Sequence, residues 1–249
     1  MAKNCPDKKI IVIMPAYNAE KTLLKTYNDI PKDWIDEIIL TDDKSKDETI
    51  KIAQELGITT FTHLKNTGYG GNQKTCYIEA LKRNADIIIM LHPDYQYNPK
   101  DIPDLIKPII EEKADLVLGS RLLKGNAMKY GMPWWKFISN RFLTSIENMI
   151  LEQKLSEYHT GYRAYSGKLL HSIPFMENSD DFVFDTQLIA QTIFIGKKIA
   201  EISSDSQYFK DASSISLRRS IEYGLLTLKT MLEFKMAKAS IKKYRWLSE

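Results

Sequence analysis

The feature that most constrains the fold of this 249-residue chain is the alternation, over its first half, of short apolar runs with segments of helical periodicity. The apolar runs, expected to be buried strands, lie at residues 10–14, 37–40, 58–63, 87–91 and 116–118. Helices are expected between them, at residues 20–30, 45–56, 73–84 and 99–113. Such alternation is typical of a mainly parallel sheet that is built by right-handed crossovers and covered by helices on both faces. The sequence therefore predicts an α/β fold.

Three local signals refine these boundaries. Pro15 is expected to break the first strand, because proline cannot donate to a ladder of hydrogen bonds. Ser45 and Glu48 have the spacing of a capping box, which predicts that the second helix begins there. The glycine-rich segment at residues 68–72 is expected to be a flexible turn, with a helix beginning at Gln73.

The second half of the chain is less regular. Helices are predicted at residues 134–151 and 184–195, and strands at residues 162–165 and 197–202. We expect one domain over residues 1–215, with halves at 1–122 and 123–215, followed by a C-terminal helical segment at residues 216–249.

That C-terminal segment combines an apolar stripe with positive charge. The stripe has helical spacing and consists of Leu217, Ile221, Leu225, Leu228, Leu232 and Met236. Between Lys229 and Arg245 there are six basic residues and one acidic residue, a net charge of +5 in a chain whose total is +3. Three interpretations stay open for the helix: packing in the core, a contact between copies of the chain, or a peripheral contact with an anionic membrane.

Composition and charge exclude several classes of protein. No apolar run approaches the ~20 residues that span a bilayer, and the polar start of the chain lacks the apolar core of a secretory signal. We therefore expect a cytoplasmic protein, with a peripheral position at the inner face of the cytoplasmic membrane as the alternative. Cys5 and Cys76 are expected to be free thiols. Outside the basic tail the net charge is −2, which argues against nucleic-acid binding.

Polar residues follow the predicted strands at their carboxyl ends. These segments are residues 15–20, 42–43, 92–96 and 120–121. In open α/β sheets such loops meet at one edge, where ligands bind, so we expect the four segments to converge. A Rossmann dinucleotide site is not expected at residues 68–71, because Gln73 stands at the third glycine position and the segment follows the third strand.

Five motifs along the chain, taken in order, resemble those of the family 2 glycosyltransferases of GT-A fold. The motifs are Met14-Pro15-Ala16-Tyr17-Asn18, Thr41-Asp42-Asp43-Lys44-Ser45, Asp94 with Gln96, Gly119-Ser120-Arg121 and Thr160-Gly161-Tyr162-Arg163. Within the family they are most similar to the soluble catalytic domains of polyprenyl-phosphate sugar transferases, the dolichol-phosphate mannose synthase type. The resemblance implies transfer of a sugar from a UDP- or GDP-sugar, by a single displacement with inversion, to a polyprenyl phosphate or a glycan.

For the nucleotide-sugar donor, the resemblance implies that Pro15, Tyr17 and Glu20 line the base and ribose. Asp42, with Asp43, would accept a hydrogen bond from the base, although two acids after a strand also suit a turn. Near the phosphates, backbone N–H groups and the positive N-terminus of a helix point to Gly71 and Lys74, with a plain loop as the alternative.

For the metal, family members usually carry two carboxylates, Asp-x-Asp, and here the first is replaced by His92. The predicted ligands are His92, Asp94 and Gln96, and the predicted cofactor is Mn²⁺ or Mg²⁺. Because Mg²⁺ prefers oxygen ligands whereas Mn²⁺ accepts imidazole, the histidine either shifts the metal preference or leaves Asp94 and Gln96 to act with the diphosphate.

For catalysis, the resemblance implies that Asp94, Arg121 and Glu157 act on the reacting groups. Arg121 would neutralise phosphate through its bidentate guanidinium, with a surface salt bridge as the alternative. Glu157 would be a general base or would position the acceptor, and its alternative is a solvated carboxylate. Arg163 and Arg141 are predicted to contact the acceptor, with bracing of the fold as the alternative for Arg163. Trp134 and Trp135, beside Lys136 and Arg141, are expected to form an interfacial or acceptor-facing patch, with packing of the helix on the core as the alternative.

The remaining candidates receive structural interpretations. Asp185 is expected to cap a helix, and no zinc-ligand set is formed by the scattered His63, His159 and His171. Two other functions stay open. One is a donor-binding protein that lost catalysis with the change at His92. The other is a sugar-phosphate nucleotidyltransferase, which would need a glycine-rich basic loop at residues 15–18.

Overall fold

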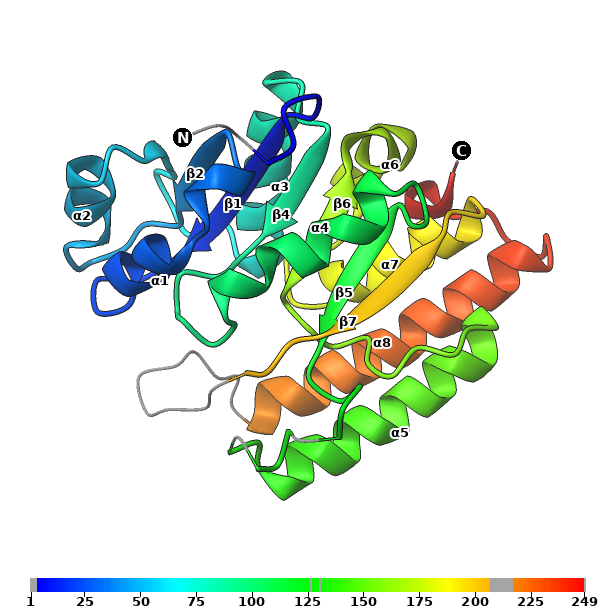
Figure 1. Ribbon diagram of the computed structural model, residues 1–249. Helices are drawn as coiled ribbons and strands as arrows, with labels where there is room; N and C mark the ends of the chain where they lie inside the picture. The colour runs from blue at the N-terminus through cyan, green and yellow to red at the C-terminus, as the bar shows by residue number, and fades with distance from the viewer. Residues whose placement is uncertain (1–3, 126, 130, 207–216, 249) are drawn as a thin grey trace.

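The computed structural model describes residues 4–125, 127–129, 131–206 and 217–248 of the chain. These residues form a seven-stranded sheet in the order β3-β2-β1-β4-β6-β5-β7 (Figure 1). The strands are β1 (Ile10–Ala16), β2 (Glu37–Asp42), β3 (Thr59–Thr62), β4 (Ile87–Met90), β5 (Leu116–Ser120), β6 (Arg163–Ser166) and β7 (Ile199–Ser203). Neighbouring strands are parallel except β6, which pairs antiparallel with β4 and β5. The predicted mainly parallel sheet is confirmed, and it takes strands from both expected halves of the domain.

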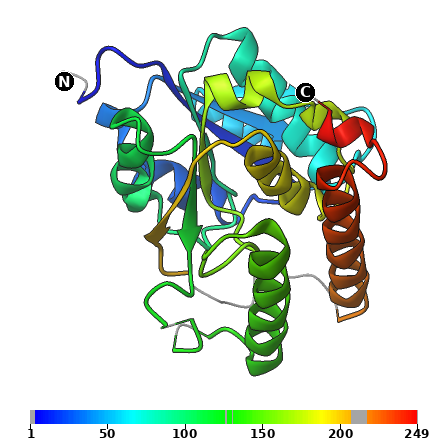
Figure 2. The same cartoon turned by 90° about the vertical axis from the view of Figure 1, so that its right-hand side faces the viewer.

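Helices cover both faces of the sheet (Figure 2). They are α1 (Leu23–Asp29), α2 (Thr49–Glu55), α3 (Tyr69–Lys82), α4 (Ile102–Ile110), α5 (Trp134–Leu151), α6 (Gly167–Ser172), α7 (Phe184–Phe194) and α8 (Leu217–Lys238). Alternate residues of a strand point to opposite faces. Ile10 and Val12 of β1 therefore pack with α1, α2 and α4, whereas Ile11 and Ile13 pack with α3, α6, α7 and α8.

Three predicted boundaries are wrong. β1 continues through Pro15, because its ladder with β4 ends at Ile13 while its ladder with β2 runs on to Ala16. Helix α3 begins at Tyr69, so two glycines of the expected turn lie in its first turn. Helix α2 begins at Thr49 without a side-chain cap, and Ser45 instead donates its backbone N–H to Asp42 at 2.8 Å.

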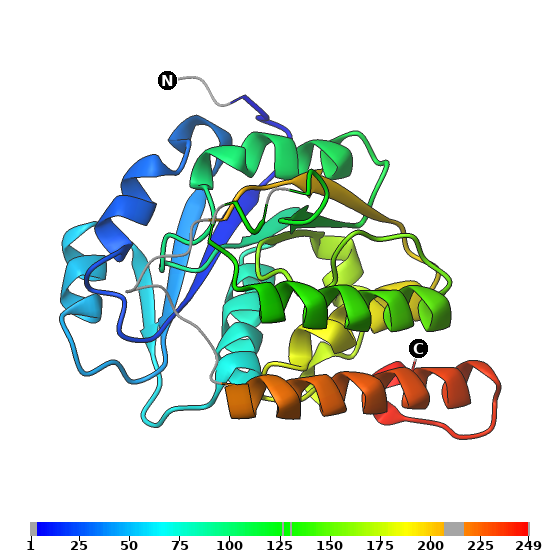
Figure 3. The same ribbon diagram turned by 90° about the horizontal axis from the view of Figure 1, so that it is seen from below.

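The C-terminal helix α8 lies beside α5, outside the sheet (Figure 3). Its predicted apolar stripe faces outward: Ile221, Leu225 and Leu232 are 59%, 64% and 59% exposed. The expectation that the stripe packs in the core is therefore wrong. The side chain of Leu217 and the expected boundary at residues 215–216 lie outside the described residues.

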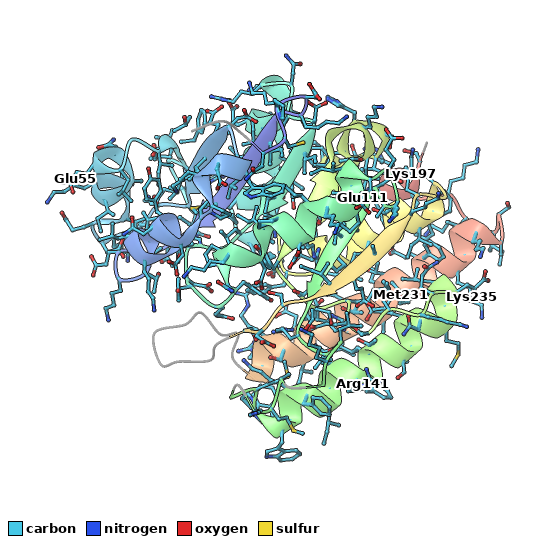
Figure 4. All side chains as sticks on the ribbon, viewed as in Figure 1. Glu55, Glu111, Arg141, Lys197, Met231 and Lys235 are labelled. Atoms are coloured by element: carbon cyan, nitrogen blue, oxygen red, sulfur yellow. The ribbon has the colours of Figure 1, made fainter. Side chains whose placement is uncertain are left out.

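The inner face of α8 explains why the sequence pattern misled. Met231 and Phe234 pack into the core, and Figure 4 shows Met231 on the helix. Thr227 and Thr230 are also buried on the helix. Because two polar residues lie in the buried face, the apolar periodicity is stronger on the exposed one. Among the helices of the described residues, none combines the length and apolar character that a membrane span requires.

Candidate active site

A cavity of about 750 Å³ lies at the carboxyl edge of the parallel strands. The loops that follow β1, β2, β4 and β5 all contribute to it, which confirms the expected convergence. Helices α5 and α8 supply the opposite wall. The residues that the sequence singled out and that line it are Pro15, Tyr17, Asp43, His92, Asp94, Gln96 and Arg121.

The loop after β1 forms one lip of the cavity. Tyr17 lines the cavity there with 52% of its surface exposed. Asn18 joins this loop to the next, since its backbone N–H donates to Ser45 Oγ at 2.8 Å and its side chain accepts from the Lys46 N–H at 2.9 Å. Glu20 lies outside the lining and accepts a hydrogen bond from the Glu48 backbone at 3.0 Å.

The two adjacent acids after β2 have different surroundings. Asp42 lies outside the cavity lining, and both of its carboxylate oxygens contact Ser45. Asp43 lines the cavity but is almost fully buried, and it accepts from His63 Nδ1 and the Thr67 N–H, both at 2.8 Å, and from the Gly68 N–H at 3.1 Å. The contacts of Asp43 hold the segment before α3 in place, whereas the local contact expected of a turn after the strand is made by Asp42 with Ser45.

The N-terminus of α3 is occupied by the protein itself. The N–H groups of Gly70 and Gly71 donate to the Asp180 carbonyl at 2.7 and 3.2 Å. Lys74 is buried, and its Nζ donates to the Asn178 carbonyl at 2.5 Å and pairs with Asp180 Oδ1 at 2.7 Å. Neither Gly71 nor Lys74 lines the cavity, so these contacts give no support to their predicted role at the donor phosphates.

The loop after β4 brings His92, Asp94 and Gln96 to the cavity. Asp94 Oδ1 accepts the Gln96 N–H at 3.1 Å across Tyr95, whose φ of +58° lies in the left-handed region. Within the described residues, no three His, Cys, Asp or Glu side chains are grouped so that they could hold a metal ion by themselves. One imidazole, one carboxylate and one amide oxygen nevertheless suit a divalent ion whose remaining ligands come from a diphosphate.

Arg121 is held by Glu157. Its backbone N–H donates to Glu157 Oε2 at 2.8 Å, its Nε donates to Oε1 at 2.9 Å, and Nη2 also contacts Oε1. Nη2 donates further to the His159 carbonyl at 2.7 Å. Asn140 Nδ2 donates to Glu157 at 2.7 Å.

The surroundings of Glu157 decide its charge. Burial by itself raises the pKa of this fully buried carboxyl, but the charge and hydrogen bonds of Arg121, with Asn140, outweigh it and lower the pKa. The Glu157 carboxylate is therefore bound to Arg121 and Asn140 and lies outside the cavity lining. These contacts support a role in holding Arg121 rather than the predicted role of general base.

The two predicted acceptor arginines both lie outside the cavity lining. Arg163 is fully buried, pairs with Asp185 Oδ1 at 3.1 Å and donates to the Tyr158 carbonyl at 3.1 Å. Burial alone would lower the pKa of Arg163, but the Asp185 carboxylate outweighs it and raises the pKa. Arg141 lies on the exposed side of α5, where it donates to the Ser156 carbonyl at 3.3 Å (Figure 4). The contacts of Arg163 support bracing of the fold.

Asp185 does not cap a helix, which corrects the sequence expectation. Val183 is the N-cap of α7, and no side chain caps it. The Asp185 carboxylate instead reaches the cavity and accepts hydrogen bonds from Tyr69 Oη at 2.8 Å and Gln73 Nε2 at 3.1 Å.

Sequence reasoning missed the residues that α8 contributes to the cavity, whereas Lys136 of α5 belongs to the patch that the sequence offered as acceptor-facing. Lys136 lines it and has no carboxylate partner among the described residues. Its pKa is lowered by burial first and by the charge of Arg121 second. Arg219 and Tyr223, one turn apart on α8, also line the cavity, and Arg219 pairs with Asp181 at 2.7 Å. The four-residue spacing of Arg219 and Tyr223 could have placed them on one face of the helix, but the apolar stripe on the other face of α8 dominated the sequence pattern.

Comparisons with known proteins agree with this architecture. The glycosyl transferase family 2 model matches residues 11–173. An uncharacterized protein of Methanocaldococcus jannaschii is 31% identical over 200 residues, which cover 80% of this chain and 82% of that protein. The UDP-N-acetylglucosamine–dolichyl-phosphate N-acetylglucosaminyltransferase of Methanococcus voltae is 33% identical over 181 residues, 66% of this chain and 72% of that protein.

Solved structures show the same fold. Glucosyl-3-phosphoglycerate synthase from Mycobacterium tuberculosis, in complex with UDP, is similar with a TM-score of 0.72 at 18% identity, over 96% of this chain and 83% of that one. Its complex with Mn²⁺, UDP-glucose and phosphoglyceric acid gives a TM-score of 0.70 over 96% of this chain and 82% of that one. The expected GT-A fold is confirmed, and family membership favours glycosyl transfer over the nucleotidyltransferase alternative. The chain belongs to the family 2 glycosyltransferases.

Proposed function

We propose that the protein transfers a sugar from a nucleotide-sugar donor to a polyprenyl phosphate at a membrane surface, with inversion in a single displacement. The observation that carries this proposal is the wall of the cavity formed by α5 and α8. On the cavity side it presents Lys136, Arg219 and Tyr223, and on the outer side it presents exposed apolar side chains. A cation next to an apolar surface matches the two parts of a lipid phosphate.

The apolar side chains of the two helices lie on one side of the pair. Gly224 of α8 faces Leu143 of α5, where a Cβ would lie 3.9 Å from Leu143 Cδ1. The helices run in the same direction (Figure 3). Counted around each helix from that contact, both sets of apolar residues turn to the side away from the sheet. The exposed set consists of Trp134, Ile138, Phe142 and Met149 on α5, and Ile221, Leu225, Leu228 and Leu232 on α8. We call this set the α5/α8 apolar face.

The contacts of Glu157 with Arg121 and Asn140 support a phosphate acceptor. A hydroxyl acceptor must lose a proton to a base, whereas a phosphate acceptor is already an anion and needs none. Glu157, which the sequence suggested as a base, is held by Arg121 and Asn140. The relative from Methanococcus voltae, whose name specifies dolichyl phosphate as its acceptor, supports the proposal further.

On the donor side, we infer that Pro15 and Tyr17 contact the nucleotide, and that His92, Asp94 and Gln96 hold a divalent ion, Mn²⁺ or Mg²⁺. Such an ion supplies charge that stabilises the departing diphosphate. Arg121 adds a fixed positive charge at the same edge of the sheet. Four predicted donor residues lie outside the lining and would support the loops around the donor: Glu20, Asp42, Gly71 and Lys74.

The function is tested by nucleotide release from UDP- and GDP-sugars in the presence of Mn²⁺, with a short-chain polyprenyl phosphate, a neutral glycan, or no acceptor. We expect release that depends on the polyprenyl phosphate. Lys136→Ala should raise the acceptor KM roughly tenfold to hundredfold, the equivalent of one charge-assisted hydrogen bond, with the donor KM unchanged. Lys113→Ala, an exposed lysine outside the cavity, is the matched control. Turnover on the glycan alone would refute the lipid acceptor, and donor binding without turnover on any acceptor would favour the binding-protein alternative.

The membrane contact predicts a defect in vesicle binding. Changing Phe142 and Leu225 of the α5/α8 apolar face to Glu should lower affinity for anionic vesicles at least about tenfold, because each large apolar side chain contributes about 1.5–3 kcal/mol when buried. Leu64→Glu is the control, since Leu64 is 96% exposed and lies on another surface. Co-sedimentation with the vesicles measures the effect. Unchanged vesicle binding, with loss of a dimer in analytical ultracentrifugation, would assign the face to a contact between copies of the chain.

A further inference from the structure

We propose that His92 is a metal ligand through its Nδ1 atom, and that Tyr69 and Asp185 hold it in the tautomer that allows this and so give the site a preference for Mn²⁺ over Mg²⁺. The inference rests on the proposed function, because the donor diphosphate completes the metal site. Tyr69 and Asp185 are positioning residues in this scheme.

The tautomer follows from counting protons. The Tyr69 hydroxyl has one proton, and it donates that proton to Asp185 Oδ2 at 2.8 Å. The hydroxyl oxygen of Tyr69 lies 3.2 Å from His92 Nε2 and can only accept a hydrogen bond there. Nε2 must therefore carry the proton in this contact. In the neutral ring Nδ1 then has the free lone pair, and within the described residues it has no hydrogen-bond partner.

The Asp185 end of the relay is fixed. One carboxylate oxygen, Oδ2, accepts from Tyr69. The other, Oδ1, pairs with Arg163 Nη1 at 3.1 Å and accepts from Gln73 Nε2 at 3.1 Å. Arg163 is fully buried and Asp185 is 6% exposed, so these contacts hold the carboxylate in a fixed orientation. In this orientation Asp185 accepts the hydrogen bond of the Tyr69 hydroxyl. The Tyr69 oxygen can then only accept a hydrogen bond from His92.

The imidazole ring is also confined by packing. Tyr69 lies between Phe182 and His92, with ring centroids 4.7 and 5.5 Å apart. On another side of the His92 ring, a Cβ at Gly161 would approach Cδ2 at 3.0 Å and Nε2 at 3.1 Å, so the backbone at Gly161 lies close against the ring. The ring therefore has little freedom to turn Nε2 away from Tyr69.

A histidine held in this way resembles metal ligands whose second ring nitrogen donates to a carboxylate, here through one tyrosine. Such outer partners set the tautomer and the ring orientation, and their loss lowers metal affinity about 10- to 100-fold. Asp94 and Gln96, on the same loop, add oxygen ligands beside the imidazole. Mg²⁺ demands oxygen ligands, whereas Mn²⁺ also accepts imidazole nitrogen. With His92 in place of an acid, the site therefore keeps its ligand and changes its metal preference.

The test measures Mn²⁺ and Mg²⁺ binding to the full chain in the presence of UDP, by calorimetry, with pulsed electron paramagnetic resonance of bound Mn²⁺ to detect coupling to a nitrogen nucleus. We expect nitrogen coupling in the wild type. Tyr69→Phe should lower Mn²⁺ affinity about 10- to 100-fold and change Mg²⁺ affinity little. His92→Gln places an amide near the Nε2 position and can keep the contact with Tyr69, but it has no ligand atom at the Nδ1 position. It should abolish the nitrogen coupling, and His92→Asp should shift the preference towards Mg²⁺.

The outcomes separate this inference from the proposed function. If Mn²⁺ and UDP bind together but without nitrogen coupling, or with the same Mn²⁺ affinity in Tyr69→Phe and His92→Gln, the role of His92 is refuted while the donor site stands. If neither metal binds together with UDP, the metal-dependent donor site itself is refuted. Tyr27→Phe, outside the cavity, is the control for loss of a tyrosine hydroxyl, and melting temperatures show whether each variant is folded.

Discussion

Replacement of Asp94 by alanine is expected to abolish measurable turnover, a loss of at least about a thousandfold in kcat/KM, while the protein stays folded. Asp94 is the one carboxylate of the loop after β4 that lines the cavity beside His92 and Gln96. A group that stabilises charge developing in the transition state is typically worth about a hundredfold to a thousandfold in rate, and a metal ligand acts on the whole diphosphate. Nucleotide release in saturating Mn²⁺ measures the effect.

Asp94→Asn separates chemistry from local structure in this experiment. Asp94 Oδ1 accepts the Gln96 N–H at 3.1 Å, and this bond helps to hold Tyr95 in its left-handed conformation. The asparagine side chain retains an acceptor for that bond but carries no charge. We therefore expect Asp94→Asn to be as inactive as Asp94→Ala and to melt closer to the wild type. Full activity in Asp94→Asn would remove Asp94 from the metal site.

Replacement of Glu157 by glutamine is expected to lower the free energy of unfolding by about 3–5 kcal/mol, the cost of breaking a buried ion pair by removing one partner. Glu157 is fully buried and contacts Arg121 through both carboxylate oxygens. The same change should lower kcat/KM at least about tenfold, because Arg121 loses the group that orients it at the cavity. Urea unfolding and nucleotide release measure the two effects. Glu152→Gln, an exposed glutamate, should stay within about 0.5 kcal/mol of the wild type.

The pH dependence of stability gives a second measure of the same pair. Burial opposes ionisation of Glu157, but Arg121 outweighs it, so the folded pKa lies below the ordinary value of 4.5. A group whose pKa is depressed on folding stabilises the protein above its unfolded pKa. That stability is lost as the pH falls from the ordinary value through the lower folded one. We expect urea midpoints of the wild type to fall below about pH 4.5 more steeply than those of Glu157→Gln. Parallel slopes would show that the pair does not contribute.

The loops that follow parallel strands could be placed from the sequence because they depend on local order. Apolar runs and their spacing locate the strands, and parallel strands bring their carboxyl ends to one edge. Pro15, Asp43, Asp94 and Arg121 were therefore expected near one another, and they line one cavity. Individual contacts could not be placed in this way. Asp42, next to Asp43, turns its carboxylate to Ser45, and sequence position does not distinguish the two acids.

Sequence patterns placed only part of the α5/α8 wall: they predicted the helix at residues 134–151 with an acceptor-facing patch, but not its packing against α8. Lys136 and Arg219 are 83 residues apart in the chain and line the same cavity because two helices pack side by side. The apolar stripe of α8 was visible as a pattern, but its direction depends on which face the rest of the protein covers. The buried face contains Thr227 and Thr230, so periodicity alone favoured the wrong side.

The sequence by itself determined the sheet, the convergence of its loops and the family, because these depend on local periodicity and on motifs in a fixed order. The tertiary structure decided which ionisable groups form ion pairs or hydrogen bonds with one another. Glu157 with Arg121, Asp185 with Arg163, and Tyr69 with His92 are partners far apart in the chain. Charge, proton position and exposure are set by such neighbours, and chain folding brings those neighbours together only in three dimensions.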